Sequence, residues 1–151
     1  MDAGREPAGG VFARLGPTRD HLVPVISVVA AGGALGAAAR FLAGERWPTA
    51  AGTFPLTTTA INVIGCAAIG VLMVAVTERW PHRRLVRPFL GTGLLGGFTT
   101  FSTYTVDVHH LTADGQPARA ALYLIATPAL ALLAAALGSR VTRLLLTRRS
   151  R

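Results

Sequence analysis

One stretch of the chain, residues 91–104, brings together groups that could bind ions. The pair Gly96-Gly97 is followed closely by the β-branched pair Thr99-Thr100, and both residue types disfavour a continuous helix. A break in a helix leaves backbone carbonyls without partners, and such carbonyls can bind a cation. Hydroxyl groups and the positive edges of aromatic rings suit an anion, and they follow directly in Phe101, Ser102, Thr103 and Tyr104. The sequence therefore predicts a helix break with ion-binding chemistry, with a soft helix that carries polar side chains as the alternative.

A second polar set lies earlier in the chain and consists of Thr57, Thr58, Thr59 and Asn62. Thr58 and Asn62 are four residues apart, so they share one face of a helix. In a hydrophobic environment, a side-chain amide either holds neighbouring helices together or lines a polar pathway. The sequence leaves both interpretations of Asn62 open.

Both polar sets lie in long uncharged runs, of which the chain has four: residues 22–39, 47–77, 88–106 and 120–139. The helix in the second run is expected to begin near Phe54. Each run is about long enough to cross a hydrocarbon core ~30 Å thick at ~1.5 Å per residue. Hydrophobic residues make up 51% of the chain and its mean hydropathy is +0.47, both high for a soluble globule. We predict an all-α integral membrane protein with four transmembrane helices, the third broken near the middle of the membrane.

The 151 residues suffice for one domain, which we place at residues 22–139. Residues 1–21 are rich in Gly, Pro and Arg and predict a disordered tail, while residues 140–151 form a basic C-terminal tail. A cleaved signal peptide is an alternative for the first run, with Ala37-Ala38-Ala39 as the cleavage site. We disfavour it because cleavage would leave three unpaired spans and remove a glycine pair.

Glycines at a spacing of four residues recur within the runs, as Gly32 with Gly36 and as Gly93 with Gly97. In lipid, small residues at this spacing let two helix backbones approach closely. We interpret the glycines of the first run, and Gly70 in the second, as sites of close helix packing.

The charge pattern excludes several function classes. The net charge is +8 and all fifteen basic residues are arginine, but they lie between and outside the runs, as in membrane loops rather than in a nucleic-acid-binding surface. The single cysteine, Cys66, and the four histidines show no zinc-ligand spacing. No Asp, Glu or Lys lies in the middle of a run, whereas a proton-coupled exporter needs an embedded carboxylate. Passive conduction without enzyme chemistry fits best; a small proton-coupled multidrug exporter and a structural membrane subunit are the alternatives.

Three motifs make the chain resemble the Fluc (CrcB-type) fluoride channels over about residues 24–138. Residues 32–41, GGALGAAARF, resemble the first-span glycine motif with its arginine, and residues 62–66, NVIGC, followed by Gly70, resemble the second-span asparagine motif. Residues 93–104 are similar to the third-span signature, which is the most specific of the three. The resemblance implies a passive, fluoride-selective channel in the cell membrane. Hydrogen fluoride crosses lipid as the neutral acid and ionises inside, so the trapped anion needs such a way out.

The resemblance also implies roles for individual residues. Backbone carbonyls of Gly96 and Thr99 would hold one structural sodium ion that is not transported, and Arg40 would lie at the aqueous vestibule. The fluoride pore would be formed by Asn62, Phe101, Ser102, Thr103, Tyr104, Thr58 and Thr127, with Tyr123 as a further polar group. Two residues depart from the pattern: Tyr104 stands where a second phenylalanine is expected, and Thr57 where glycine is usual.

Finally, the resemblance implies an antiparallel dimer, which raises a question of orientation. Four spans place both tails and the central loop on one side of the membrane, with twelve of the fifteen arginines; Arg40, Arg46 and Arg119 lie on the other. This bias predicts that both termini are cytoplasmic. A homodimer of opposed subunits needs a chain that inserts both ways, so we favour a partner that is a paralogue of opposite orientation, with a homodimer as the alternative.

Overall fold

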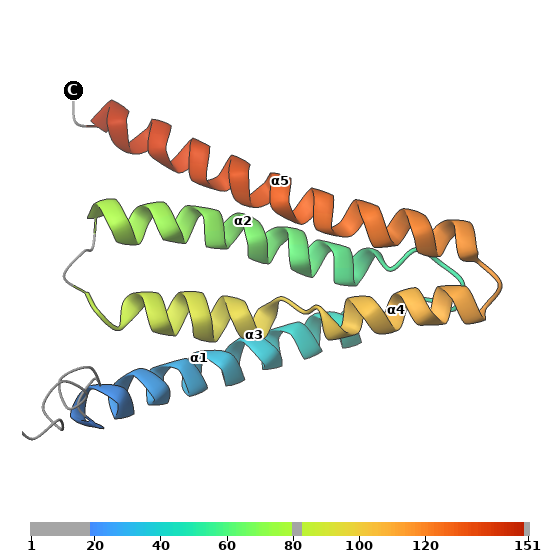
Figure 1. Cartoon of the computed structure of the whole chain (residues 1–151), viewed down its shortest axis with the longest axis horizontal. Helices are drawn as coiled ribbons and strands as arrows, with labels where there is room; N and C mark the ends of the chain where they lie inside the picture. The colour runs from blue at the N-terminus through green and yellow to red at the C-terminus, as the bar shows by residue number, and fades with distance from the viewer. Residues whose placement is uncertain (1–18, 80–82, 150–151) are drawn as a thin grey trace, which may run out of the picture.

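The computed structural model describes residues 19–79 and 83–149, and its regular elements there are all helices. They are α1 (Arg19–Arg46), α2 (Leu56–Arg79), η2 (Arg87–Leu95), α3 (Gly96–Phe98), α4 (Ser102–Ala113) and α5 (Pro117–Arg149). Elements η2, α3 and α4 follow one another along a single rod, which packs against α1 at one end and against α5 at the other (Figure 1). Helix α2 packs along α5, and it also contacts η2.

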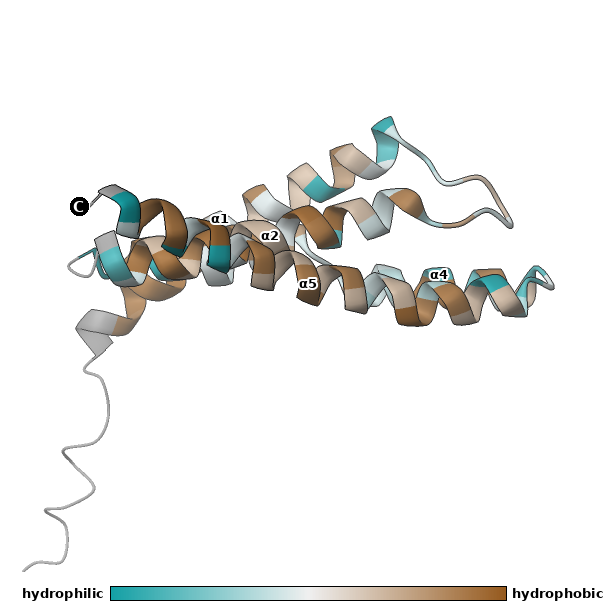
Figure 2. Cartoon of the chain, turned by 90° about the horizontal axis from the view of Figure 1, so that it is seen from above, coloured by the Kyte–Doolittle hydropathy of each residue, from teal (hydrophilic) through white to brown (hydrophobic). Residues whose placement is uncertain are grey.

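Within the described residues, three helices are long and apolar enough to cross a membrane, over Leu22–Arg46, Leu56–Glu78 and Pro117–Arg148. Hydrophobic residues cover most of their length, and hydrophilic residues gather toward the helix ends (Figure 2). A soluble protein would bury these residues, but here many large apolar side chains on α1 and α5 are exposed, as lipid-facing residues are. The predicted class, an all-α membrane protein, is confirmed.

The rod that contains the third predicted run is interrupted between Phe98 and Ser102 (Figure 1). It begins as the wide π-helix η2, and the helix ends where Thr99 takes an extended conformation, with φ −73° and ψ 155°. The interruption follows the glycine pair rather than coinciding with it, because Gly96 and Gly97 are still helical. Its position is explained below by contacts that Thr100 makes.

Two boundaries differ from those that the sequence suggested. Helix α1 begins at Arg19, so three residues of the predicted tail 1–21 are helical, and residues 1–18 lie outside the described part. Helix α5 continues to Arg149, so most of the predicted tail 140–151 is helix. The reason is that arginine and leucine, which fill this segment, are good helix formers, and cations near a helix C-terminus interact favourably with its dipole.

Glycines bring the helices into close contact, as predicted. A Cβ atom at Gly36 would overlap the carbonyl oxygen of Leu94, and one at Gly93 would lie 2.8 Å from the carbonyl oxygen of Val29, so α1 and η2 touch backbone to backbone. A Cβ atom at Gly70 would likewise overlap the Ala135 carbonyl of α5. Gly33 is not required to be glycine in this way, because a Cβ atom added there would come no closer than 4.0 Å, to the Gly93 carbonyl oxygen.

Candidate functional site

The helix interruption between α3 and α4 is held by Asn62 of α2. The side-chain amide of Asn62 donates a hydrogen bond to the Thr100 carbonyl over 3.0 Å, and its oxygen accepts one from the Thr100 N–H over 2.8 Å. Both hydrogen-bonding groups of one backbone residue are therefore satisfied by a side chain from another helix. These two bonds explain why the helix is interrupted at Thr99 and Thr100. They correspond to the first of the two roles considered for Asn62, which is to hold neighbouring helices together.

The carbonyls predicted to hold sodium lie on either side of this clamp. In a continuous helix, the Thr100 and Thr103 amides would donate to the carbonyls of Gly96 and Thr99. Instead, Thr100 N–H donates to Asn62, and Thr103 N–H donates to Thr100 Oγ1 over 3.1 Å. Both carbonyls lose their helical donors, and carbonyl oxygens freed in this way are hard ligands of the kind that bind small cations. The donor set at Gly96 and Thr99 therefore fits a sodium ion.

Arg40 reaches the same region from α1. Its Nε donates a hydrogen bond to the Gly97 carbonyl over 3.1 Å, so it satisfies a third backbone group near the end of α3. Packing of Gly97 against Gly33 brings the two backbones close enough for this contact. The arginine predicted at the vestibule is thus also a structural tie between α1 and the interruption.

Four aromatic rings form a continuous stack that starts at the interruption. The ring of Phe101 lies 5.6 Å from that of Tyr104, which lies 5.2 Å from Tyr123, which lies 5.2 Å from Phe54 in an edge-to-face contact. Phe101 is 80% exposed, whereas Tyr123 is fully buried. The stack therefore runs from an open face of the chain into its interior.

Asp107 is a site residue that the sequence analysis did not single out. Its Oδ2 accepts a hydrogen bond from the Tyr123 hydroxyl over 3.0 Å, which ties α4 to α5 beside the aromatic stack. The sequence held a signal for it, because Asp107 follows Tyr104 by three residues and so shares its helix face. The long-range contact with Tyr123 could not be inferred from that spacing.

Two cavities, each of about 290 Å³, have Thr100 in both of their linings. The first is lined by Asn62, Cys66, Thr99, Thr100, Phe101, Tyr104, Thr127, Pro128 and Ala131. The polar residues that line the second are Arg40, Glu45, Thr49, Thr57, Thr58, Thr100, Thr103 and Asp107. Together they gather most of the predicted pore residues around the clamp, with both charge signs at the Arg40 end.

Three of the site residues named in the sequence analysis, Gly96, Ser102 and Tyr123, are not in the linings of these two cavities. Gly96 is exposed at the end of η2, and Ser102 is exposed with its hydroxyl 3.3 Å from that of Thr100. Thr127, by contrast, lines the first cavity; it is 2% exposed, and its hydroxyl pairs with that of Thr59 over 3.2 Å. Ser102 and Gly96 thus face outward in the single chain.

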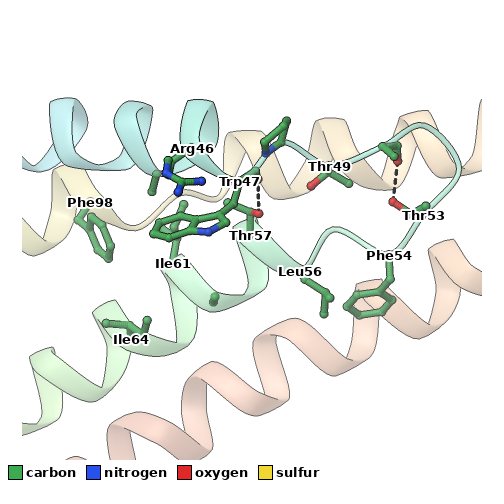
Figure 3. Close-up of a pocket in the computed structure, with 14 residues that line it drawn as sticks. Arg46, Trp47, Thr49, Thr53, Phe54, Leu56, Thr57, Ile61, Ile64 and Phe98 are labelled. Carbon is green, nitrogen blue, oxygen red and sulfur yellow. Dashed lines mark hydrogen bonds between the residues drawn. The ribbon is translucent and has the colours of Figure 1, made fainter.

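A larger cavity, of about 750 Å³, is a different one and is lined by none of the predicted site residues. Figure 3 shows it between the end of α1, the following loop and α2, with Trp47, Phe54, Leu56 and Phe98 around it. The loop is held by the Thr57 hydroxyl, which donates to the Trp47 carbonyl over 2.5 Å (Figure 3). Its lining is mainly apolar, and the predicted pore residues line the two smaller cavities instead.

Comparison with known proteins agrees with these features. The family model described as "CrcB-like protein, Camphor Resistance (CrcB)" matches residues 27–139. The protein named fluoride-specific ion channel FluC 1 of Streptomyces coelicolor is 58% identical over 120 residues, which cover 80% of this chain and 78% of the relative. FluC 2 of Streptomyces avermitilis is 59% identical over 104 residues, 69% of this chain and 66% of the relative. FluC 2 of Nocardia farcinica is 48% identical over 131 residues, 87% of this chain and 91% of the relative. The chain therefore belongs to the CrcB-like protein family.

Proposed function

We propose that this protein is a passive, fluoride-selective ion channel of the cell membrane, which lets cytoplasmic fluoride leave the cell and so reduces its toxicity. The observation that carries the proposal is the clamped helix interruption, with hydroxyl groups and an aromatic stack beside it, in a chain up to 59% identical to proteins named fluoride-specific ion channels. Neither this chemistry nor the family calls for an enzyme activity. The exporter alternative gains no support, because the relatives carry the names of channels.

The two cavities at Thr100 suggest how the anion would move. Arg40 would draw fluoride toward the vestibule, where Thr58 and Thr103 offer hydroxyl groups. Beyond Thr100, the ring edges of Phe101 and Tyr104 would replace part of the hydration shell, together with Thr127. The Asn62 amide is occupied by Thr100, so we assign it the task of holding this path open rather than of binding fluoride throughout.

We further propose that one sodium ion binds the carbonyls of Gly96 and Thr99. Support comes from the two diverted amides, which leave these oxygens without helical donors. The ion would supply positive charge next to an anion path and would stabilise the interruption. It would be structural and would not be transported.

The open face at the interruption supports a dimer. If η2, α3 and α4 form the predicted third span, with the interruption near the middle of the membrane, then lipid would meet Gly96, Ser102 and the exposed ring of Phe101. Irregular backbone at membrane depth persists only when protein covers it or it lines a polar path. A second, antiparallel chain would provide that cover, and the pore of each subunit would be incomplete without it.

The arginine distribution supports a partner other than an identical chain. Twelve of fifteen arginines would share the cytoplasmic side with both termini, which favours one orientation. Streptomyces avermitilis has proteins named FluC 2 and FluC 3, so one organism can carry several such channels. A reporter fused to the C-terminus tests the orientation: signal from the cytoplasmic side alone is expected, and equal signal from both sides would contradict a fixed orientation.

Growth on fluoride tests the function in cells. A bacterium that lacks its own fluoride channel should grow at higher fluoride concentrations when it makes this chain together with a paralogue of opposite orientation. Intracellular fluoride should then follow the transmembrane gradient, including when an uncoupler removes the proton gradient. Protection that disappears with the uncoupler would favour the proton-coupled alternative.

A further inference from the structure

Helix α5 contains a proline in its interior, Pro128, within the segment that is apolar enough to cross a membrane. Proline has no N–H, and its ring pushes against the carbonyl four residues earlier, so that carbonyl loses its helical hydrogen bond. In α5 this carbonyl belongs to Leu124. Lipid offers no replacement donor, so the carbonyl needs a partner from within the protein.

That partner is Tyr104 of α4. The Tyr104 hydroxyl donates a hydrogen bond to the Leu124 carbonyl over 2.6 Å. Tyr104 is only 7% exposed, and it lines the same cavity as Pro128. The bond thus joins the helix that starts at the interruption to the helix that contains the proline.

The same bond fixes the Tyr104 ring within the aromatic stack. The ring is held between Phe101, tilted by 45° to it, and Tyr123, tilted by 44°. With its hydroxyl tied to α5, the ring cannot change rotamer or slide along α5 without breaking the bond. Its position beside Phe101 therefore depends on a carbonyl that is free because residue 128 is proline.

We infer that Tyr104 is a positioning residue, whose hydroxyl satisfies the carbonyl freed by Pro128 and so holds the ring that flanks Phe101 on the fluoride path. This inference rests on the proposed function. It gives a physical reason for the tyrosine where the family resemblance implies phenylalanine. In this chain a phenylalanine would keep the ring but leave the Leu124 carbonyl without its donor, so tyrosine and proline act as a matched pair.

A double-mutant cycle tests the pair. Tyr104→Phe should lower the fluoride efflux rate of reconstituted protein about tenfold, because it leaves the Leu124 carbonyl without a donor and frees the ring to move. Pro128→Ala returns an N–H to the Leu124 carbonyl, so the double variant should regain most of the lost rate. Tyr123→Phe is the matched control: it removes the bond to Asp107, and Pro128→Ala should not repair it.

The melting temperatures of the same variants provide a readout that does not depend on fluoride. Tyr104→Phe should lower the melting temperature, and the loss should vanish in the Pro128→Ala background. If the unaltered protein conducts no fluoride, the proposed function fails, while this cycle still tests the bond. Unchanged flux and melting in Tyr104→Phe, or a double variant as defective as Tyr104→Phe alone, would overturn the inference.

Discussion

The side-chain amide of Asn62 takes the place of helical hydrogen bonds at Thr100, because it pairs with both the N–H and the carbonyl of that residue. Asn62 is 9% exposed, so loss of its amide would leave both Thr100 groups without their protein partner at a largely buried position. The backbone of Thr100, which lines both cavities, would then carry two unsatisfied polar groups. Stability and conduction should therefore fail together at this residue.

The first prediction concerns that amide. Asn62→Leu keeps a similar volume but removes both bonds, and each orphaned backbone group costs about 1–3 kcal/mol. The variant should melt at a clearly lower temperature in detergent and conduct little fluoride. Thr77→Val on the same helix is the control, since the Thr77 hydroxyl bonds the Met73 carbonyl one turn earlier in its own helix, and it should change little. Equal melting of the two variants would contradict the clamp.

The second prediction concerns Phe101. This ring is exposed in the single chain and stacks on Tyr104, so it contributes little to the internal packing of its own subunit. Phe101→Ile should nearly abolish fluoride flux while the folded dimer persists, as seen by size-exclusion chromatography. Phe98→Ile, on the other side of the interruption and outside the stack, should retain far more flux. Retained flux in Phe101→Ile would remove this ring from the pore.

Among the elements, α1 and η2 are the pair most dependent on glycine. A Cβ atom at Gly36 would overlap the Leu94 carbonyl and lie 2.8 Å from the Phe98 amide nitrogen. Helix α1 also carries Arg40, whose bond to Gly97 requires the same close approach. Moving α1 away from η2 would therefore break the Arg40–Gly97 bond and so disturb the helix interruption directly.

The third prediction compares two glycines of α1. Gly36→Ala should destabilise the protein by about 1–3 kcal/mol, because the backbones must move apart. Gly44→Ala should be neutral or slightly stabilising, since a Cβ there meets nothing within 4 Å among the described residues and alanine favours helix. Thermal unfolding of the two variants measures the difference. A Gly36→Ala protein as stable as Gly44→Ala would contradict the close packing.

Long apolar runs were enough to predict α1, α2 and α5, because a span needs little beyond length and hydrophobicity. The helical ends at Arg19 and Arg149 were missed, because hydropathy does not report helix formation by arginine and leucine outside the membrane. The residue pairs Gly96-Gly97 and Thr99-Thr100 predicted the region of the helix break but not its exact residue, because Asn62 fixes that from another helix. The pairs Tyr123 with Asp107 and Tyr104 with Leu124 are likewise products of tertiary contact.

For the whole molecule, the proposed assembly is two chains of opposite orientation, a proposal based on the open face at Phe101 and the uneven arginines. A sodium ion at Gly96 and Thr99 would belong to that assembly, because Gly96 is exposed in the single chain. Its loss should therefore weaken the dimer and the conduction path at once.

The fourth prediction follows from that ion. Replacing sodium with a large organic cation should lower both the melting temperature and the fluoride flux, since a ligand that binds only the folded state stabilises it. Returning sodium should restore both. Melting and flux that do not change without sodium would rule out a required structural ion.

Fluoride efflux from liposomes tests the central claim most directly. Vesicles loaded with fluoride would contain this protein, alone or with a paralogue of opposite orientation, and an electrode outside would record the released ion. Rapid fluoride release is expected with the paralogue, with no matching release from vesicles loaded with chloride and no dependence on a proton gradient. Rapid release from the chain alone would show that a paralogue is not required. Vesicles that retain fluoride under both conditions would contradict the assignment of this protein as a fluoride channel.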